Sequence, residues 1–285
     1  MDKLGILLIN KPAGITSFDI IRRLRKVLQI KQIGHAGTLD PFAEGLMQIL
    51  VGKATKVAQY LTNYDKKYQV TLQFGIKTDT GDATGTIIEE SQPPKIIIDT
   101  DNLKEAVENF TEQIPPIYSA IKINGQRAYK LARKNEDFVM EARPIQVRDF
   151  EIIDYSFPYL TYKCQVSKGT YIRALSEQIA DLYGTIATTT KLNRISVSDM
   201  LVEDAIDLDK ITPDNWERYL LPIDLFLKCP VVQLTEEQDK DFWYGRPIKI
   251  ECETDSDLVI AKYGSQTKGI GKVIQSTLHP SKVFK

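Results

Sequence analysis

The sequence predicts an α+β protein with one large domain and a small β-rich domain at its carboxyl end. The 285 residues include 42% hydrophobic and 26% charged residues, enough for one large core or two unequal ones. Strand and helix patterns mix without the regular alternation of a parallel α/β sheet. After about Cys229, short apolar runs and several glycines replace the longer elements. These observations place a small β domain behind a larger mixed one.

The chain opens with a predicted strand, turn and helix. Residues 4–9 form a continuous apolar run typical of a buried strand, and residues 10–14 carry the Pro and Gly of a turn. Thr16 can cap a helix because Asp19 stands three residues further on, and apolar residues then recur at helical spacing. A polar, glycine-containing stretch over 31–45 interrupts this regular pattern. Catalytic or binding residues could therefore lie in this stretch.

The following elements are predicted from apolar period and turn residues. In chain order they are a strand at 47–51, a helix at 54–61, a strand at 68–74 with one face buried, a polar loop at 79–85, a helix at 102–110, a hairpin turn at Asn124-Gly125, strands at 145–155 and 160–166, and a helix at 170–182 closed by Gly184.

The net charge of −1 hides an uneven distribution. Residues 199–257 carry sixteen acidic and six basic side chains, so the rest of the chain has an excess of nine positive charges. Residues 117–134 and 258–285 each hold five basic residues and no acid. Such runs suit a polyanion, because Lys and Arg along a phosphate backbone release condensed counterions. An ordinary solvated face would have the same composition, so charge alone leaves both interpretations open.

Several classes of protein are excluded or disfavoured. No apolar run approaches the roughly 20 residues of a membrane-spanning helix, and residues 1–12 lack the features of an export signal, so a cytoplasmic protein is expected. The three cysteines, Cys164, Cys229 and Cys252, and the two histidines are widely spaced. Neither a disulfide framework nor a zinc site is expected.

One carboxylate stands out within residues 34–45. Asp40 has glycines on both sides and Pro41 immediately after it, a pattern that can hold a carboxylate on an irregular loop close to a ligand. An Asp before Pro is more often a plain turn residue. Only Glu44 stands nearby, so paired acid/base hydrolysis is not indicated, and the sequence has no P-loop, Rossmann glycine pattern or nucleophile elbow.

Five ordered blocks give a more specific signal. They are Lys11 to Ser17 (KPAGITS), Gly34 to Gly45 with its GTLDP core, Lys67-Tyr68 with Phe74-Gly75 and Thr78 to Asp82, Pro115 to Lys122 (PPIYSAIK) with Asn124-Gly125 and Tyr129, and Ser167 to Arg173 (SKGTYIR). With these blocks the sequence resembles the bacterial tRNA pseudouridine-55 synthases, the TruB family. The resemblance is clear over about residues 4–194, is weak over 199–257, and resumes near 269–271 and 279–284.

The resemblance implies a domain plan and a reaction. Residues 1–228 would form a pseudouridine synthase catalytic domain, with a mixed, mostly antiparallel sheet flanked by helices and an RNA-gripping insertion at about 111–148. Residues 229–285 would form a small PUA-like RNA-binding β domain. The enzyme would isomerise uridine 55 in the T-loop of tRNA by flipping the base, cleaving its glycosidic bond and forming a carbon–carbon bond. No metal and no organic cofactor is implied.

The same resemblance assigns three catalytic residues. Asp40 takes the place of the essential aspartate, whose carboxylate can act as a nucleophile or take a proton from the ribose. Arg173 takes the place of its arginine partner, which we expect to keep the acid ionised and to orient both oxygens with two donors. Tyr68 takes the place of the tyrosine that stacks on the flipped uracil. Read from the sequence alone, Arg173 could have a purely structural partner and Tyr68 could be core.

Further residues match substrate-binding positions. Tyr171 and Leu192 correspond to pocket residues near the base, although the sequence after Leu192 departs from the family's usual glycine-phenylalanine ending. His35 corresponds to the histidine that wedges against the T-loop; a lone loop histidine more often has a structural role. Five basic residues lie in the segment that resembles the RNA-gripping insertion, with tyrosines interleaved as phosphate contact plus stacking would require. They are Lys122, Arg127, Lys130, Arg133 and Lys134.

Two alternatives remain. A guide-dependent pseudouridine synthase of a ribonucleoprotein shares GTLDP but should lack the 78–82 and 118–129 blocks. A tRNA-folding chaperone would use the same binding surface without chemistry. In place of these two, we expect a monomeric enzyme that binds the T-stem-loop of tRNA. It would associate with no membrane and need no protein partner.

Overall fold

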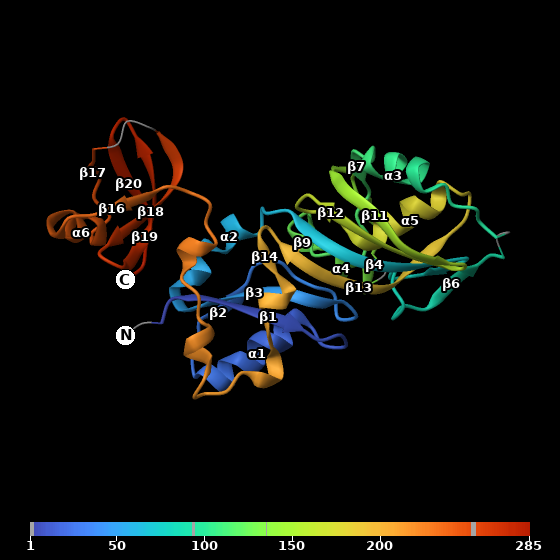
Figure 1. Ribbon diagram of the computed structural model, residues 1–285, viewed down its shortest axis with the longest axis horizontal. Helices are drawn as coiled ribbons and strands as arrows, with labels where there is room; N and C mark the ends of the chain where they lie inside the picture. Colours follow the sequence, from blue (N-terminus) through green and yellow to red (C-terminus); the bar gives the residue numbers. More distant parts are fainter. Residues whose placement is uncertain (1–2, 93–94, 135, 252–254) are drawn as a thin grey trace.

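The computed structural model describes residues 3–92, 95–134, 136–251 and 255–285. Within these ranges a nine-stranded sheet forms the body of the molecule and a separate five-stranded sheet forms its carboxyl end (Figure 1). The strands of the large sheet, in spatial order, are β11 (Val147–Ser156), β12 (Tyr159–Val166), β4 (Lys66–Phe74), β13 (Ala187–Val197), β3 (Glu44–Val51), β1 (Gly5–Lys11) and β15 (Ile206–Asp207), with β2 (Ile33–His35) beside β3 and β14 (Met200–Leu201) beside β13. Within the described part of this large sheet, only β13 with β3 and β1 with β15 run parallel, which confirms a mixed, mostly antiparallel sheet.

Three helices cover the large sheet. They are α1 (Ser17–Leu28), α3 (Thr100–Glu108) and α5 (Ile172–Asp181). Thr16 caps α1 through the predicted capping box with Asp19, and the helix ends at Gln29 in the left-handed conformation. Helix α3 begins two residues before its predicted start, because Asp99 accepts hydrogen bonds from the first backbone amides. These three helices are predicted correctly in kind and differ only at their ends.

The segment after β3 differs from the prediction. A single helix was expected at 54–61, and the structure has a 3-10 helix (Gly52–Val57) followed by one turn of α-helix, α2 (Ala58–Leu61). Gly52 has a φ of 61°, and a β-carbon there would lie 2.0 Å from the carbonyl oxygen of Lys3. The chain turns sharply at Gly52 into the 3-10 helix, and the spacing of apolar residues does not indicate such a turn.

The central strands β1 and β3 are buried on both faces. Leu7 and Ile9 point to the side of α1, whereas Ile6 and Leu8 point to a second apolar cluster on the opposite side. A strand covered on both faces loses the polar alternation of a half-exposed one. This is why residues 4–9 read as a continuous apolar run.

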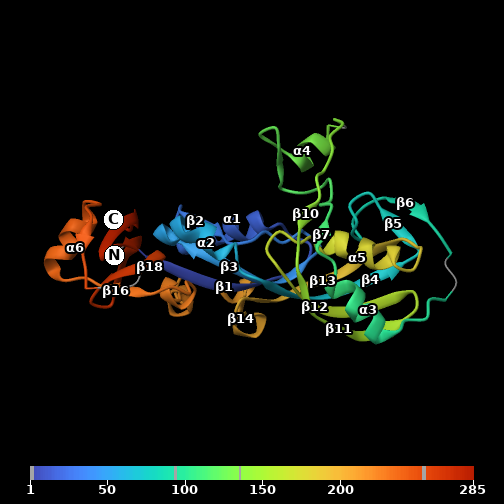
Figure 2. The ribbon, with the colours of Figure 1, turned by 90° about the horizontal axis from the view of Figure 1, so that it is seen from above.

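An insertion projects from the sheet between β7 (Glu112–Gln113) and β10 (Arg143–Pro144), which pair with each other at its base (Figure 2). It carries a hairpin of β8 (Lys122–Ile123) and β9 (Gln126–Arg127), followed by α4 (Ala128–Ala132). Asn124 and Gly125 both have positive φ, as the Asn-Gly hairpin signal predicts. A further hairpin, β5 (Ile76–Thr78) with β6 (Ile87–Glu90), encloses the polar loop predicted at 79–85.

The small sheet is formed by the last part of the chain. Its spatial order is β16 (Val231–Gln233), β18 (Ser256–Tyr263), β19 (Gln266–Ile274), β20 (Thr277–Val283) and β17 (Ile248–Lys249). The small β domain is confirmed as a curved five-stranded unit consistent with a PUA-like domain. It also holds a helix that we did not predict, α6 (Glu236–Trp243), which Thr235 caps with Gln238. Phe242 alone is fully buried on α6, so the apolar periodicity was too weak to reveal the helix.

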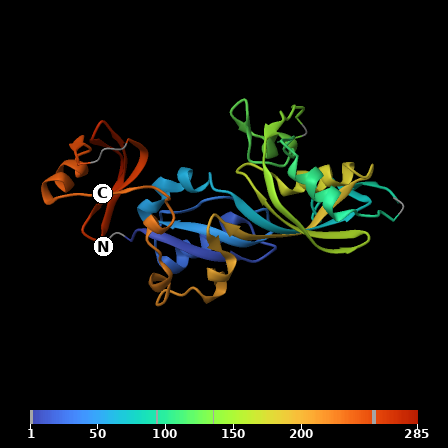
Figure 3. The same ribbon diagram turned by 45° about the horizontal axis from the view of Figure 1, so that its top comes forward.

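The two sheets share one apolar cluster. Leu50 and Phe226 from the body pack in it with Ile260, Ile270 and Phe284 from the small sheet. Four 3-10 helices lead from one sheet toward the other (Figure 3). They cover Val202–Asp204, Leu208–Lys210, Trp216–Tyr219 and Ile223–Leu225. A domain boundary after residue 228 remains a prediction.

The acidic segment 199–257 pairs with basic residues elsewhere in the chain. Asp209 lies 2.5 Å from Arg23 on α1, and Asp239 lies 3.0 Å from Lys268 on β19. Asp224, in the segment before the small sheet, forms an ion pair with Lys262 on β18 at 2.5 Å. Part of the local negative charge is therefore used in contacts within the molecule.

No helix in the described part of the chain is long and apolar enough to cross a membrane. Cys164 is a buried free thiol and Cys229 a partly buried one, whereas Cys252 lies outside the described residues.

Candidate active site

Asp40 lies on the loop between β2 and β3, called here the aspartate loop (residues 36–43). The first turn of α1 holds this loop. The Ser17 hydroxyl donates to the carbonyl of Leu39 and accepts from the Leu39 amide, both at 2.9 Å. The Gly14 amide donates to the Pro41 carbonyl at 2.8 Å. The residues on either side of Asp40 are thus fixed by the turn and helix that follow β1.

Lys11 holds the same loop from the end of β1. Its side chain is fully buried, and Nζ donates to the carbonyls of Ala43 (2.6 Å), Pro12 (3.0 Å) and Pro41 (3.2 Å). Burial lowers the pKa of Lys11 to about 8, and the charge of Asp40 partly opposes that fall. A buried ammonium with three carbonyl acceptors ties both ends of the turn to the aspartate loop.

Arg194 supports the loop from β13. It is 1% exposed, and its guanidinium donates to the carbonyls of Leu46 (Nε, 2.7 Å), Gly37 (Nη2, 3.1 Å) and Thr38 (Nη1, 3.4 Å). The approach of β13 requires Gly45, where a β-carbon would lie 2.4 Å from the Arg194 carbonyl oxygen.

Arg173 reaches Asp40 from the first turn of α5. Its Nε lies 2.9 Å from Oδ2 of Asp40, and the Arg173 side chain is 5% exposed against 35% for that of Asp40. The two-donor grip that we expected is wrong: Nη1 donates to the carbonyl of Thr80 at 2.6 Å and Nη2 to that of Tyr118 at 3.0 Å. Arg173 therefore joins three segments, namely the aspartate loop, the 79–85 loop and the base of the insertion.

The positive charge of Arg173 lowers the pKa of Asp40, as expected, but this effect does not outweigh that of burial. Burial raises the pKa of Asp40, the Arg173 guanidinium partly offsets this rise, and the Asp82 carboxylate adds to it. Asp82 is 5% exposed, and its Oδ2 lies 3.9 Å from Nη1 of Arg173. A carboxylate held partly desolvated is a stronger base than one in water.

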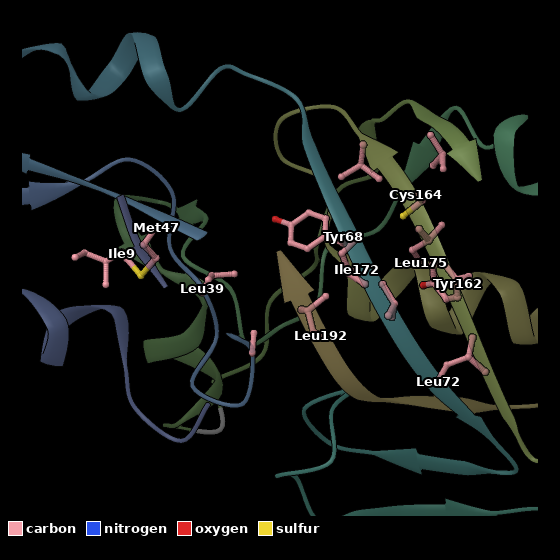
Figure 4. Close-up of a cluster of buried hydrophobic side chains, with 14 of the residues drawn as sticks. Ile9, Leu39, Met47, Tyr68, Leu72, Tyr162, Cys164, Ile172, Leu175 and Leu192 are labelled. Carbon is pink, nitrogen blue, oxygen red and sulfur yellow. The ribbon is translucent and has the colours of Figure 1, made fainter. Parts of the chain in front are cut away.

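Three apolar or aromatic side chains assigned to the pocket come from the neighbouring elements. Tyr68 on β4 and Leu192 on β13 are 7% and 6% exposed. Figure 4 shows the Tyr68 ring projecting from β4 toward the segment of Leu39, with Leu192 beside it. Tyr171 stands at the N-cap position of α5, where its side chain makes no capping hydrogen bond. Its backbone amide donates to Oε1 of Gln113 at 2.8 Å.

Burial raises the pKa of both tyrosines, and the charge of Asp40 adds to the rise in each case. The structure therefore brings Asp40, Arg173, Tyr68 and Tyr171 into one electrostatic neighbourhood. Both phenols stay protonated near neutral pH and can donate a hydrogen bond.

His35 lies on β2, opposite Ile49 of β3. Burial lowers the pKa of His35, with a smaller contribution from Arg194. Its Nδ1 is buried and has no hydrogen-bond partner within the described residues. The lowered pKa favours the neutral imidazole, which has one nitrogen that donates and one that accepts a hydrogen bond.

The five basic residues of the insertion are all exposed, on the part of the molecule that projects beyond the sheet in Figure 2. The structure does not bring them beside Asp40. Arg127 donates to the Ala120 carbonyl, the guanidinium carbon of Arg133 lies 5.6 Å from the centre of the Tyr129 ring, and Lys134 lies 3.3 Å from Glu136. Lys122 and Lys130 stand on the β8 strand and on α4.

Three residues at this site were not predicted from the sequence: Lys11, Asp82 and Arg194. Lys11 and Asp82 stand inside recognised sequence blocks, but nothing in their spacing indicates that they meet Asp40 or Arg173. Arg194 lies on β13, a strand that the sequence did not predict, and arginine is a residue type that is ordinarily exposed. All three side chains are buried, and their burial depends on tertiary contacts that the sequence does not show.

Known proteins resemble this chain over most of its length. The family model described as "TruB family pseudouridylate synthase (N terminal domain)" matches residues 25–172. The chain is 37% identical over 274 residues to tRNA pseudouridine synthase B of Clostridium kluyveri, covering 94% of each chain. It is 41% identical over 223 residues to the Clostridium novyi protein of the same name, covering 77% of this chain and 76% of that one.

The chain belongs to the TruB family. It is a pseudouridine synthase, and hence an isomerase. Among solved structures, a chain of a Cbf5–Nop10–Gar1 complex superposes with a TM-score of 0.72 at 20% identity, covering 99% of this chain and 85% of that one. At that identity the likeness establishes the shared fold.

Proposed function

We propose that the protein converts uridine 55 in the T-loop of tRNA to pseudouridine. The observation that carries this proposal is the Asp40–Arg173 pair, in which a carboxylate that is one-third exposed is held by a buried guanidinium. The names of the relatives from both Clostridium species support tRNA as the substrate. The exposed basic insertion supports binding of a phosphate backbone.

The first step is to bring the target base out of the RNA loop. Unstacking a base costs on the order of a few kcal/mol, which contacts to the flipped base and the vacated space must offset. In this proposal Tyr68 stacks on the uracil, Tyr171 and Leu192 line its pocket, and His35 occupies the T-loop beside it. The Tyr68 and Leu192 side chains are already buried in the sheet, so they require little ordering on binding.

Asp40 then acts on the nucleotide. Isomerisation breaks the bond between N1 of uracil and C1′ of ribose and forms a bond between C5 and C1′, with no redox change and no hydrolysis. The carboxylate can attack the nucleotide covalently, or take the 2′ proton of the ribose so that uracil leaves. Arg173 keeps Oδ2 in place for either route, because its other two nitrogens are anchored to backbone carbonyls.

Two other functions compete with this proposal. A guide-dependent synthase is disfavoured, because the chain retains the 78–82 and 118–129 blocks and matches bacterial tRNA enzymes along 94% of its length. A chaperone without chemistry would not need a buried Asp40–Arg173 pair. We further propose that the chain acts alone as a monomer, with residues 1–228 as the catalytic domain and 229–285 as an RNA-binding domain.

The test is tritium release from a T-stem-loop RNA labelled at C5 of its uridines, with the purified chain and no guide RNA. Replacing the C5 hydrogen by a carbon–carbon bond releases one equivalent of tritium per RNA modified. We expect one equivalent from the wild-type loop and none when the target uridine is replaced by cytidine. Release that requires an added guide RNA would support the ribonucleoprotein alternative, and tight binding without release would support the chaperone.

A further inference from the structure

Helix α1 presents an aromatic and basic stripe to solvent. Phe18, Arg22 and Arg25 follow one another at spacings of four and three residues, so they share one face of the helix. Phe18 is 55% exposed, so a large apolar side chain lies in contact with solvent. The guanidinium carbons of both arginines lie 5.8 Å from the centre of that ring. The buried face of the same helix is formed by Ile20, Ile21, Leu24 and Leu28, so the exposed ring contributes nothing to the core.

The stripe borders the active site at both ends. Ser17, immediately before Phe18, holds the backbone of Leu39, next to Asp40. At the other end, Nη2 of Arg25 donates to the carbonyl of Ile33 at 3.3 Å, on the strand that carries His35. In Figure 2, α1 and β2 lie toward the same side of the molecule as the insertion with α4. An RNA held by the insertion and reaching Asp40 would therefore pass close to this stripe.

The charges on the stripe favour a polyanion. Arg22 is paired with Asp19 at 3.0 Å, but this pair is exposed and uses few of the five guanidinium donors. The Asp19 carboxylate also accepts from the Thr16 amide and hydroxyl in the helix cap. Two arginines flanking an exposed ring provide phosphate donors and a stacking surface together, which is how proteins bind unpaired nucleotides.

We propose that Phe18, Arg22 and Arg25 form an RNA-binding surface for the nucleotides next to the flipped uridine, with Phe18 stacking on an unpaired base and the arginines contacting phosphates. This proposal rests on the proposed function and adds to it a recognition surface on the catalytic body, separate from the insertion.

Binding of a T-stem-loop RNA to the full-length protein, measured at several salt concentrations, tests the surface. Arg22→Ala/Arg25→Ala should weaken binding at least tenfold at 0.1 M salt, and should reduce the slope of log affinity against log salt by about 1.5, as expected for two lost phosphate contacts. Phe18→Leu should weaken binding about fivefold or more and leave the slope unchanged, because it removes a stacking ring and no charge.

Arg23→Ala is the matched control. It removes one arginine from the same helix, but Arg23 lies off the stripe and pairs with Asp209. Affinity should stay within about twofold of wild type and the slope should be unchanged, since an exposed pair of this kind contributes little. Thermal unfolding of each variant identifies any loss of fold, and Phe18→Leu keeps the helix free of a new cavity.

The outcomes separate this proposal from the proposed function. If wild type modifies the T-loop and the stripe variants bind like Arg23→Ala, the stripe is only a solvated helix face and this inference is overturned. If wild type releases no tritium from the T-loop, the proposed function fails whatever the stripe variants do. Loss of affinity together with the two different slope effects supports the surface.

Discussion

The aspartate loop and the insertion differ in how firmly their charged side chains are held. The loop is irregular backbone, yet Lys11, Ser17, Arg173 and Arg194 hold it with donors that are buried themselves. The insertion has two short hairpin strands, the five-residue helix α4 and exposed cations. Chemistry needs a group fixed to within a fraction of an ångström, whereas contact with a phosphate backbone tolerates side-chain movement. The comparison teaches that buried charge positions the reaction and exposed charge supplies affinity.

The largest expected effect is in the loop. Asp40→Asn keeps the size and packing of the side chain and removes its charge, so turnover should fall below detection. RNA affinity should change less than about tenfold, or roughly 1.4 kcal/mol. Single-turnover tritium release and RNA binding, measured on the same preparation, check both parts. Retained turnover would remove Asp40 from the mechanism, and a collapse of affinity would make it a structural residue.

The next effect tests whether charge or geometry matters in Arg173. Arg173→Lys keeps one positive charge and loses two of the three anchored contacts, so turnover should fall about a hundredfold with little loss of RNA affinity. Since Arg173 lowers the raised pKa of Asp40, Arg173→Ala should move the rise of the single-turnover rate to higher pH than in wild type. Rates at saturating RNA across pH provide the measurement. Equal rates for Lys and Arg would show that charge alone suffices. Loss of binding in place of rate would make Arg173 a phosphate contact.

A third prediction concerns the stability of the loop. Lys11→Met retains the length of the side chain but leaves buried carbonyls without their donor, which should cost about 2 kcal/mol of unfolding free energy at pH 7. The pKa of Lys11 is lowered to about 8, so between pH 8 and 10.5 the unfolded chain binds this proton more tightly than the folded one. The advantage of wild type over the variant should therefore grow over that range, by up to about 3 kcal/mol.

Urea unfolding of both proteins from pH 7 to 10.5 measures this difference. Lys26→Met supplies the control, because Lys26 is exposed on α1 and its removal leaves no buried carbonyl without a donor. A difference between wild type and Lys11→Met that stays constant with pH would contradict the role given to burial.

The smallest effect belongs to the insertion. Lys130→Ala/Arg133→Ala/Lys134→Ala should weaken T-arm binding about tenfold and reduce the slope of log affinity against log salt by about two, with turnover of fully bound RNA nearly normal. Lys104→Ala on α3, at an exposed position on a different helix, should leave the slope unchanged. An unchanged slope in the triple variant would mean that this face is only solvated.

The sequence by itself determined much of this protein. Apolar period and capping residues predicted β1, α1, β4 and α5, because these signals are local. The ordered blocks assigned Asp40 and Arg173, and the structure places them 2.9 Å apart. The same local logic failed at α6, where a short helix buries too few residues to show a period.

Tertiary structure decided what surrounds those residues. The raised pKa of Asp40 reflects burial, which arises only when β1, β3, β13 and α5 come together. The anchoring of Arg173 on two carbonyls, and the burial of Lys11 and Arg194, depend on contacts between segments far apart in sequence. Residue type and spacing specify which groups are present. Their desolvation and hydrogen-bond partners, which set reactivity, are properties of the assembled fold.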